Sequence, residues 1–419
     1  MKNNSDTIND KEIKDNSESL EAKFGLPSKV EFCKSCVISN QRPSSVAELT
    51  NKSSNKKPTI NLDENGICDA CNFAKYKNNE VDWEERERSL IVLLDKYRSR
   101  NSSYDILVPG SGGKDSVFAS HILKYKYNMN PLTVTWAPHL YTDVGFKNFE
   151  GWLHKGGFDN FLFTPDGKVH RKLTQLAYRN LLHPFQPFVI GQKYFAPKMA
   201  LRFNIPLVFY GENEAEYGNS IKENNTSKRD EKYFTSNSSK NKDLFFGGVH
   251  IDSLKKYSIE KENLTPYLPL EEDALHKNNI QVHYLGYYMK WVPQECYYYS
   301  VEHTGFIAND ERTEGTYSKY NSIDDKTDGF HYWTTYIKYG IGRTTYDASQ
   351  EVRNSHITRE EAVALVHRYD GEFPKRYFNE FLEYLDMDKE EFFDIANSFR
   401  SPHLWKKEGD KYILRHKVK

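Results

Sequence analysis

The chain has 419 residues, and its 58 lysines and arginines nearly balance its 59 aspartates and glutamates, which leaves a formal net charge of −1. This length predicts more than one domain with a sizeable core, and the balanced charge disfavours nucleic acid as the main ligand. No apolar run is long enough to cross a bilayer, and the N-terminus lacks the apolar core of a signal peptide. We therefore expect a cytoplasmic protein that has no membrane partner.

The N-terminal part of the chain contains four of its five cysteines. Residues 1–29 are polar and predict a flexible tail. Residues 30–78 hold two C-x₂-C pairs, Cys33 with Cys36 and Cys68 with Cys71. Four thiolates in two such pairs are typical of a tetrahedral structural Zn²⁺ site. An iron–sulfur cluster and four reduced, buried thiols stay open as alternatives.

A glycine-rich loop then follows a short apolar run at 106–108 and precedes an amphipathic run that begins at Val117. The loop reads Gly110-Ser111-Gly112-Gly113-Lys114-Asp115-Ser116. Its glycines permit a close backbone approach to a ligand, and its N–H groups and the next helix N-terminus form an anion cradle. Lys114 adds a positive charge and Asp115 a ligand for Mg²⁺, so this pattern predicts a site for the phosphates of a nucleotide.

Further apolar runs at 131–136, 159–164 and 207–211 predict strands, and helical patterns such as 171–182 lie between them. This alternation predicts an α/β fold, with a doubly wound, Rossmann-like parallel sheet covered on both faces. Ligands bind beyond the carboxyl ends of the strands in such sheets. Three predicted site residues follow strand ends, namely Trp136, Glu212 and Glu214.

We expect this nucleotide domain to span residues 79–355, with a polar insertion near 219–243. A mainly helical extension is expected over residues 356–419. A helix with Asp82 as its N-cap is predicted at 81–94.

The order Ser-Gly-Gly-Lys-Asp-Ser at 111–116 resembles the pyrophosphate-binding (PP) loop of the ATP pyrophosphatases, and it is not a Walker A loop. The resemblance implies that ATP is cleaved between its α- and β-phosphates and that AMP passes to an oxygen of the substrate. It also implies that residues 110–116 bind ATP and Mg²⁺, with Trp136 near the adenine.

The order of the blocks at 63–71, 111–116, 211–218 and 340–353 resembles the N-acetyl sugar amidotransferases of surface-polysaccharide and flagellin-glycan biosynthesis. That resemblance implies conversion of an acetamido group to an acetamidino group on an N-acetylated sugar or sugar nucleotide, for example in O-antigen biosynthesis. A nonulosonic acid and a nucleotide-linked uronic acid both stay open as the sugar. It implies a separate glutaminase subunit as the source of ammonia. The expected catalytic residues are Lys114, Asp115, Glu212 and Glu214. The expected substrate-binding residues are Arg343, Asp347 and Arg353, for which ordinary surface ion pairs are the alternative.

Three other functions compete with this interpretation. A tRNA-modifying thiolase shares the loop and the cysteine pairs, but it needs catalytic cysteines, and none lies between the loop and Cys296. A zinc-ribbon interaction protein would bind a nucleotide without turnover. An amide-forming ligase would adenylate a carboxylate instead of an amide oxygen, and the sequence discriminates it poorly.

Overall fold

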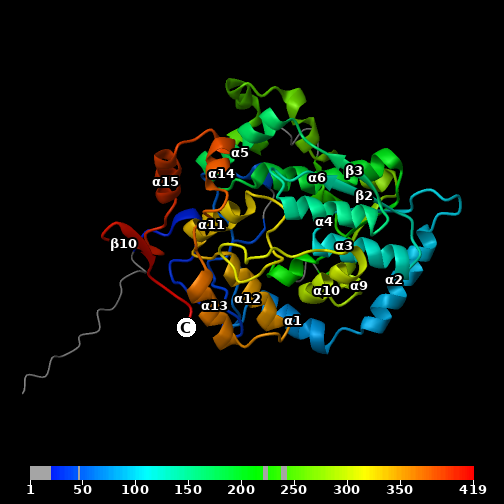
Figure 1. Ribbon diagram of the computed structural model, residues 1–419, viewed down its shortest axis with the longest axis horizontal. Helices are drawn as coiled ribbons and strands as arrows, with labels where there is room; N and C mark the ends of the chain where they lie inside the picture. Colours follow the sequence, from blue (N-terminus) through cyan, green and yellow to red (C-terminus); the bar gives the residue numbers. More distant parts are fainter. Residues whose placement is uncertain (1–19, 46–47, 220–224, 237–242) are drawn as a thin grey trace, which may run out of the picture.

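The computed structural model describes residues 20–45, 48–219, 225–236 and 243–419 (Figure 1). Within these ranges no helix combines the length and the apolar character needed to span a bilayer.

A parallel five-stranded sheet, in the order β3-β2-β1-β4-β9, forms the centre of the described chain. Its strands are β1 Ile106–Pro109, β2 Pro131–Trp136, β3 Asp159–Phe163, β4 Leu207–Tyr210 and β9 Gln281–Tyr284. Leu107 pairs with Leu132 on one side and Val208 on the other, so β1 lies in the middle of the sheet. The predicted parallel α/β sheet is thereby confirmed, and β9 is a strand that the apolar pattern had not predicted.

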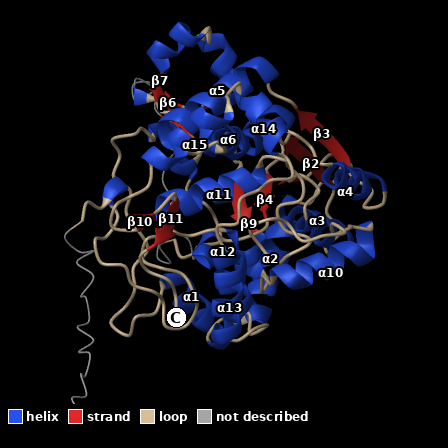
Figure 2. Cartoon of the chain, turned by 60° about the vertical axis from the view of Figure 1, so that its left-hand side comes forward, coloured by secondary structure: helices blue, strands red, loops and turns tan. Residues whose placement is uncertain are grey.

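Alternate residues of β1 point to opposite faces of the sheet, as the two-residue period of a strand requires. Leu107 belongs to the larger core, with residues of α5 (Gly167–Leu181) and α6 (Gln186–Phe203). Ile106 and Val108 belong to a second core, with residues of α2 (Trp83–Tyr97) and α3 (Lys114–His121). The two layers of helices are visible on either side of the strands in Figure 2. Burial on both faces explains why β1, β2 and β4 read as continuous apolar runs, whereas Phe161 and Leu162 of the edge strand β3 are exposed.

The other long helices before the C-terminal part are α1 Asp69–Asn79, α4 Asp143–His154 and α10 Pro293–Thr304. Short helices α8 and α9 cover Ala274–Lys277 and Leu285–Tyr288. The predicted N-cap of α2 is confirmed, because the Asp82 side chain accepts a hydrogen bond from Glu85 N–H at 2.9 Å. The helix itself runs to Tyr97, beyond the predicted end at residue 94.

The C-terminal part is helical and ends in a β-hairpin. Its elements are α11 Asp328–Tyr339, α12 Arg343–Arg353, α13 Arg359–Tyr369, α14 Phe378–Leu385, α15 Lys389–Ser398, β10 Trp405–Glu408 and β11 Lys411–Leu414. These helices cluster beside the sheet domain in Figure 1. Gly340 ends α11 with a φ of 67°, a left-handed conformation that glycine adopts without strain.

The start of the described chain packs on this C-terminal part. Leu26 is buried against Tyr339, Leu404 and Trp405, and His403 N–H donates to the Glu21 carbonyl at 3.3 Å. Residues 20–29 are thus held by the fold, whereas the first 19 residues of the expected tail lie outside the described residues.

The expected polar insertion is described only in part. Residues 220–224 and 237–242 lie outside the description, and the segment between them contains the short strand β5 (Thr235–Ser236), which pairs with β8 (Leu270–Glu271). A second small pair joins β6 (Phe245–Phe246) to β7 (Val249–His250).

Candidate functional site

The glycine-rich loop leaves the carboxyl end of β1 and leads directly into α3, whose N-cap is Gly113. Gly112 has a φ of +85°, and a Cβ placed there would lie 2.6 Å from the Cα of Phe149 in α4. A Cβ at Gly110 would overlap the Ser116 side chain. Both positions therefore require glycine, and the tight turn directs the free N–H groups of the first turn of α3 toward one space.

That space is a cavity of about 430 Å³ at the carboxyl edge of the sheet. Three segments that are far apart in the sequence line it, namely the loop at 109–116, the end of β4 with the two residues that follow it (210–212), and residues 320–324. Asn148, Gln192, Tyr284, Phe306, Asp328 and Arg343 complete most of the wall. The structure thus brings together residues 110–116, Glu212 and Arg343 of the predicted site.

Half-buried charges of both signs line this cavity. The Lys114 ammonium is 2.6 Å from Oδ2 of Asp115. Burial lowers the pKa of Lys114, but the charges of Asp115 and Glu212 more than offset it, so its pKa lies above the ordinary value and the ammonium stays charged. Oδ1 of Asp115 is buried and has no hydrogen-bond partner among the described residues. An unpaired buried carboxylate oxygen is an open position for a cation or a donor.

Glu212 contributes a second carboxylate to the same wall. Burial, with the nearby charge of Asp115, raises its pKa to about 8, although Lys114 opposes the shift. Its Oε2 accepts a hydrogen bond from the Tyr217 hydroxyl, which orients it. A divalent cation bound beside Asp115 would favour the ionised form of Glu212, and such a cation prefers oxygen ligands of this kind.

Asp324 and Asp328 also line the cavity, and the sequence did not predict them as site residues. Asp324 accepts a hydrogen bond from Ser111 Oγ at 2.8 Å, and Asp328 faces Arg343 in the same cavity. Burial raises the pKa of Asp328 to about 7, while the Arg343 guanidinium lowers it. The sequence feature that could have pointed to these two aspartates is the acidic run Asp324-Asp325-Lys326-Thr327-Asp328, which stands ahead of a helical pattern.

Four predicted site residues lie elsewhere. Trp136 does not line the cavity and is 4% exposed in the larger core, where it packs against Gly191, Phe195 and Tyr267. Glu214 points into neighbouring hollows, where its Oε2 is 3.1 Å from Nη2 of Arg229.

The last two lie further along α12. Asp347 is one turn beyond Arg343, with its Oδ1 2.9 Å from Nε of Arg343 and its Oδ2 2.6 Å from the Thr316 hydroxyl. Arg353 is at the far end of α12 and donates to the Glu216 carbonyl at 3.2 Å. The helix thus presents Arg343 alone to the cavity, with Asp347 behind it.

The four paired cysteines gather at one point, and all are buried. Their ligand atoms lie within 4.8 Å of one another, with Sγ–Sγ distances of 3.9 Å between Cys33 and Cys71 and 3.8 Å between Cys36 and Cys68. A tetrahedron with Zn–S bonds of about 2.3 Å has edges of roughly 3.8 Å. The cluster is thus the right size for a zinc ion with no open coordination position.

A buried ion pair connects the cysteine cluster to the cavity. Lys77, on the helix that contains Cys71, contacts both carboxylate oxygens of Glu216 at 2.8 and 2.9 Å and the Trp291 carbonyl at 3.1 Å. Glu216 belongs to the 3₁₀ turn at Glu214–Tyr217, and Tyr217 in that turn holds Glu212. The position of α1 therefore influences the position of a carboxylate in the cavity.

Residues 314–419 match the family described as "LPS biosynthesis protein WbpG-like, C-terminal domain". This part of the chain is similar to that domain family. It provides Asp324, Asp328 and Arg343, so the domain helps to form the wall of the cavity. The chain is also 34% identical, over 82 residues, to an uncharacterized protein of Methanocaldococcus jannaschii, and this match covers 19% of the chain and 28% of that protein.

Three solved structures are partly similar to the chain. An NH₃-dependent NAD synthetase from Campylobacter jejuni has 13% identity and a TM-score of 0.26, and the match covers 33% of this chain and 59% of that one. An NMN synthetase from Francisella tularensis has 12% identity and a TM-score of 0.25, with 48% and 85% covered. A U34-tRNA thiolase from Methanococcus maripaludis has 9% identity and a TM-score of 0.30, with 74% and 88% covered. At these TM-scores the fold class rests on the observed strand order and not on these likenesses.

Proposed function

We propose that the chain is the synthase subunit of an ATP-dependent amidotransferase, which converts the N-acetyl group of a sugar into an acetamidino group for lipopolysaccharide or another surface glycan. The observation that carries this proposal is the glycine loop, which places α3, Lys114 and the unpaired Asp115 oxygen in one cavity. The WbpG-like domain in the wall of that cavity supports the pathway.

The proposed reaction has two steps. The carbonyl oxygen of the N-acetyl group attacks the α-phosphorus of ATP, and the bond to the β-phosphate breaks to release pyrophosphate. Ammonia then attacks the carbon of the resulting imidate, the bond to the former carbonyl oxygen breaks, and AMP leaves with that oxygen. The amidine retains the nitrogen of ammonia, which a partner glutaminase would supply, and the displaced protons pass to the phosphate products and solvent.

The residues of the cavity suit these charge changes. The loop N–H groups and Lys114 would stabilise the negative charge that grows on the departing pyrophosphate. Asp115 would hold Mg²⁺, which would neutralise the phosphate oxygens when bound. Glu212 would supply a second carboxylate, either to that cation or to the protons of ammonia. Arg343 would contact a phosphate or a sugar carboxylate.

A neighbouring hollow offers a place for the adenine ring. This hollow measures about 290 Å³ and shares Gly110, Gln192 and Tyr210 with the loop cavity. Its wall contains the aromatic rings of Tyr210, Tyr233, Phe234 and Tyr284, which suit the flat face of a base. We therefore favour this hollow over the surroundings of Trp136, which are filled by protein side chains.

The thiolase alternative has no supporting thiol. Cys296 is 1% exposed in α10, and burial raises its pKa well above the ordinary value. A catalytic cysteine needs an accessible thiol with a lowered pKa. The other four cysteines form the buried cluster.

An assay of products tests the proposal. The purified protein would be incubated with ATP, Mg²⁺, ammonium chloride and a panel of N-acetylated sugars, sugar acids and nucleotide sugars, because ammonium bypasses the glutaminase. We expect AMP, pyrophosphate and a sugar product in which NH has replaced the carbonyl oxygen, as read by mass. Formation of ADP, or AMP formation that requires tRNA, would contradict the proposal.

A further inference from the structure

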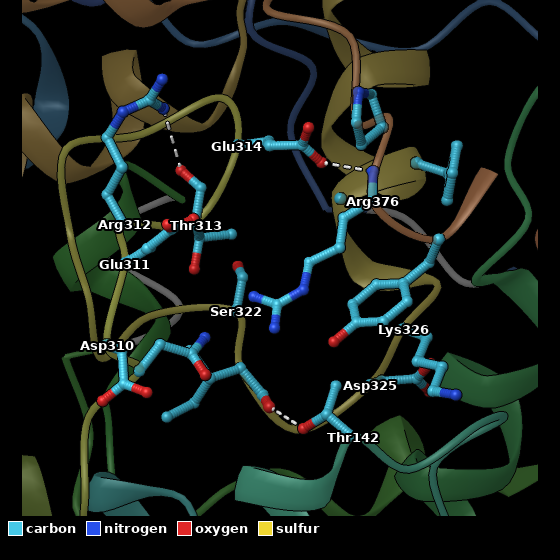
Figure 3. Close-up of a pocket in the computed structure, with 16 residues that line it drawn as sticks. Thr142, Asp310, Glu311, Arg312, Thr313, Glu314, Ser322, Asp325, Lys326 and Arg376 are labelled. Atoms are coloured by element: carbon cyan, nitrogen blue, oxygen red, sulfur yellow. Dashed lines mark hydrogen bonds between the residues drawn. The ribbon is translucent and has the colours of Figure 1, made fainter.

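A second cavity of about 510 Å³ adjoins the loop cavity (Figure 3). Ser322 and Ile323 line both cavities, and the residues that follow are divided between them. Asp324 and Asp328 face the loop cavity, whereas Asp325 and Gly329 line the second one. The segment at 322–329 thus contributes to the walls of both cavities, which places the second cavity beside the first.

The second cavity contains an arginine whose backbone is held by a hydrogen bond and whose guanidinium has no ion-pair partner among the described residues. Arg376 lies ahead of α14, and its backbone N–H donates to Glu314 Oε2 at 3.0 Å. Figure 3 shows its guanidinium in the middle of the hollow, facing Ser322. No carboxylate of the described chain lies within ion-pair distance of this group, whereas Arg312 on the rim is paired bidentately with Glu372 at 2.6 and 2.8 Å.

The wall around Arg376 carries charges of both signs, which suit a polar molecule that also bears an anionic group. Lys326 lines the same cavity, and its ammonium and the Arg376 guanidinium each lie 5.4 Å from the ring centre of Tyr377. Asp310 and Glu311 line another part of the wall, where carboxylates suit the hydroxyl groups of a sugar. An unpaired guanidinium in such a hollow is a ready donor for the two oxygens of a carboxylate or phosphate.

We propose that this second cavity binds the acceptor sugar, and that Arg376 determines specificity by binding an anionic group on that sugar. This inference rests on the proposed function and adds to it the location of the acceptor and the residue that selects it. The anion is a sugar carboxylate or the phosphate of a nucleotide sugar. Most of the named wall belongs to residues 314–419, which gives the WbpG-like domain the task of holding the acceptor.

Calorimetric titration of the full chain tests this assignment. The probes are N-acetylneuraminic acid for the carboxylate, UDP-N-acetylglucosamine for the phosphate, and neutral N-acetylglucosamine. A non-hydrolysable ATP analogue is present throughout, so that the loop cavity does not capture the diphosphate. The variants are Arg376→Gln and the control Lys375→Gln, which removes an exposed charge from the same segment but from outside the cavity wall.

We expect one anionic probe to bind the wild type more tightly than the neutral sugar, and the better probe identifies the source of the anion. Arg376→Gln should weaken that probe by about 10- to 100-fold, as expected for the loss of a charge-assisted hydrogen bond, while Lys375→Gln should change it by less than about threefold. Equal loss in both variants, no loss in Arg376→Gln, or no binding of either anion to the wild type would overturn the assignment.

A separate titration of the ATP analogue distinguishes this failure from failure of the proposed function. If the analogue binds and the anionic sugars do not, the acceptor site is wrong and the nucleotide site stands. If the anionic sugars bind through Arg376 and the analogue does not bind, the acceptor site stands and ATP use is wrong.

Discussion

Asp115 is the residue on which the proposed chemistry depends most. One of its oxygens is held by Lys114, and the other is buried without a partner in the described chain. The Asp115→Asn variant keeps the shape but loses the charge that would hold the cation. We expect AMP formation to fall by about 100-fold or more, with little change in the melting temperature. Asp95→Asn, which alters an exposed carboxylate on α2, is the control, and equal activity in the two variants would contradict the role of Asp115.

The buried His331 ring makes the free energy of unfolding depend on pH. Burial lowers its pKa to about 3, with smaller contributions from the charges of His183 and Arg343. The folded chain therefore keeps this ring neutral while the unfolded chain protonates it below its ordinary pKa of about 6.5. Its contribution to stability is present above about pH 6.5 and declines as the pH falls toward 3.

Lowering the pH from about 7 to about 4 should reduce the free energy of unfolding of His331→Phe less than that of the wild type. The difference should be on the order of a few kcal/mol. The ring stacks on Phe185 at 4.9 Å, so phenylalanine preserves the packing. Urea unfolding at a series of pH values measures the effect. Parallel slopes for the wild type and His331→Phe would refute the prediction.

At the scale of elements, the contact between α1 and the 3₁₀ turn after β4 depends on the Lys77–Glu216 pair, whose side chains are 2% and 7% exposed. Lys77→Met leaves the Glu216 carboxylate buried without its partner. We expect a loss of about 3–5 kcal/mol in the free energy of unfolding.

The double variant Lys77→Met with Glu216→Leu removes both charges and should recover most of that loss. Chemical denaturation of the wild type and of both variants measures this difference. A double variant that is as unstable as the single one would show that packing, and not the buried charge, determines the stability of this contact.

At the scale of the whole molecule, the cysteine cluster connects residues 33–71 to the C-terminal part. Arg359 of α13 donates to the carbonyl groups of Cys36 and Cys33 at 3.2 and 3.4 Å, and Ile341 of the C-terminal part is buried among the cysteines. A zinc ion there would stabilise a junction between the N-terminal, nucleotide and C-terminal parts.

Cys68→Ser should therefore reduce bound zinc, measured by elemental analysis, and lower the melting temperature. Proteolysis should become faster near residues 30–78 and also near α13. Cys296→Ser is the matched control, because that thiol is buried outside the cluster. A Cys68→Ser protein with full zinc content would contradict the assignment of the cluster.

Local features were within reach of the sequence. The positions of β1 to β4, the parallel α/β class and the helix start at Asp82 follow from periodicity and capping, which act over a few residues. Gly110 and Gly112 shape their own turn, and the spacing of each cysteine pair limits how far apart its two sulfurs can lie. These properties depend on neighbours in the chain, so the amino-acid order determines them directly.

Only the tertiary structure decided which side chains meet. Asp324 and Asp328 join the loop across more than two hundred residues of intervening chain, and β9 lies beside β4 although its short run gave no signal. Glu212 and Glu214 are two residues apart, yet the turn at Glu214–Tyr217 sends one to Lys114 and the other to Arg229. The direction of each side chain depends on packing between distant segments. The residue pattern of one segment does not reveal which other segment it will pack against.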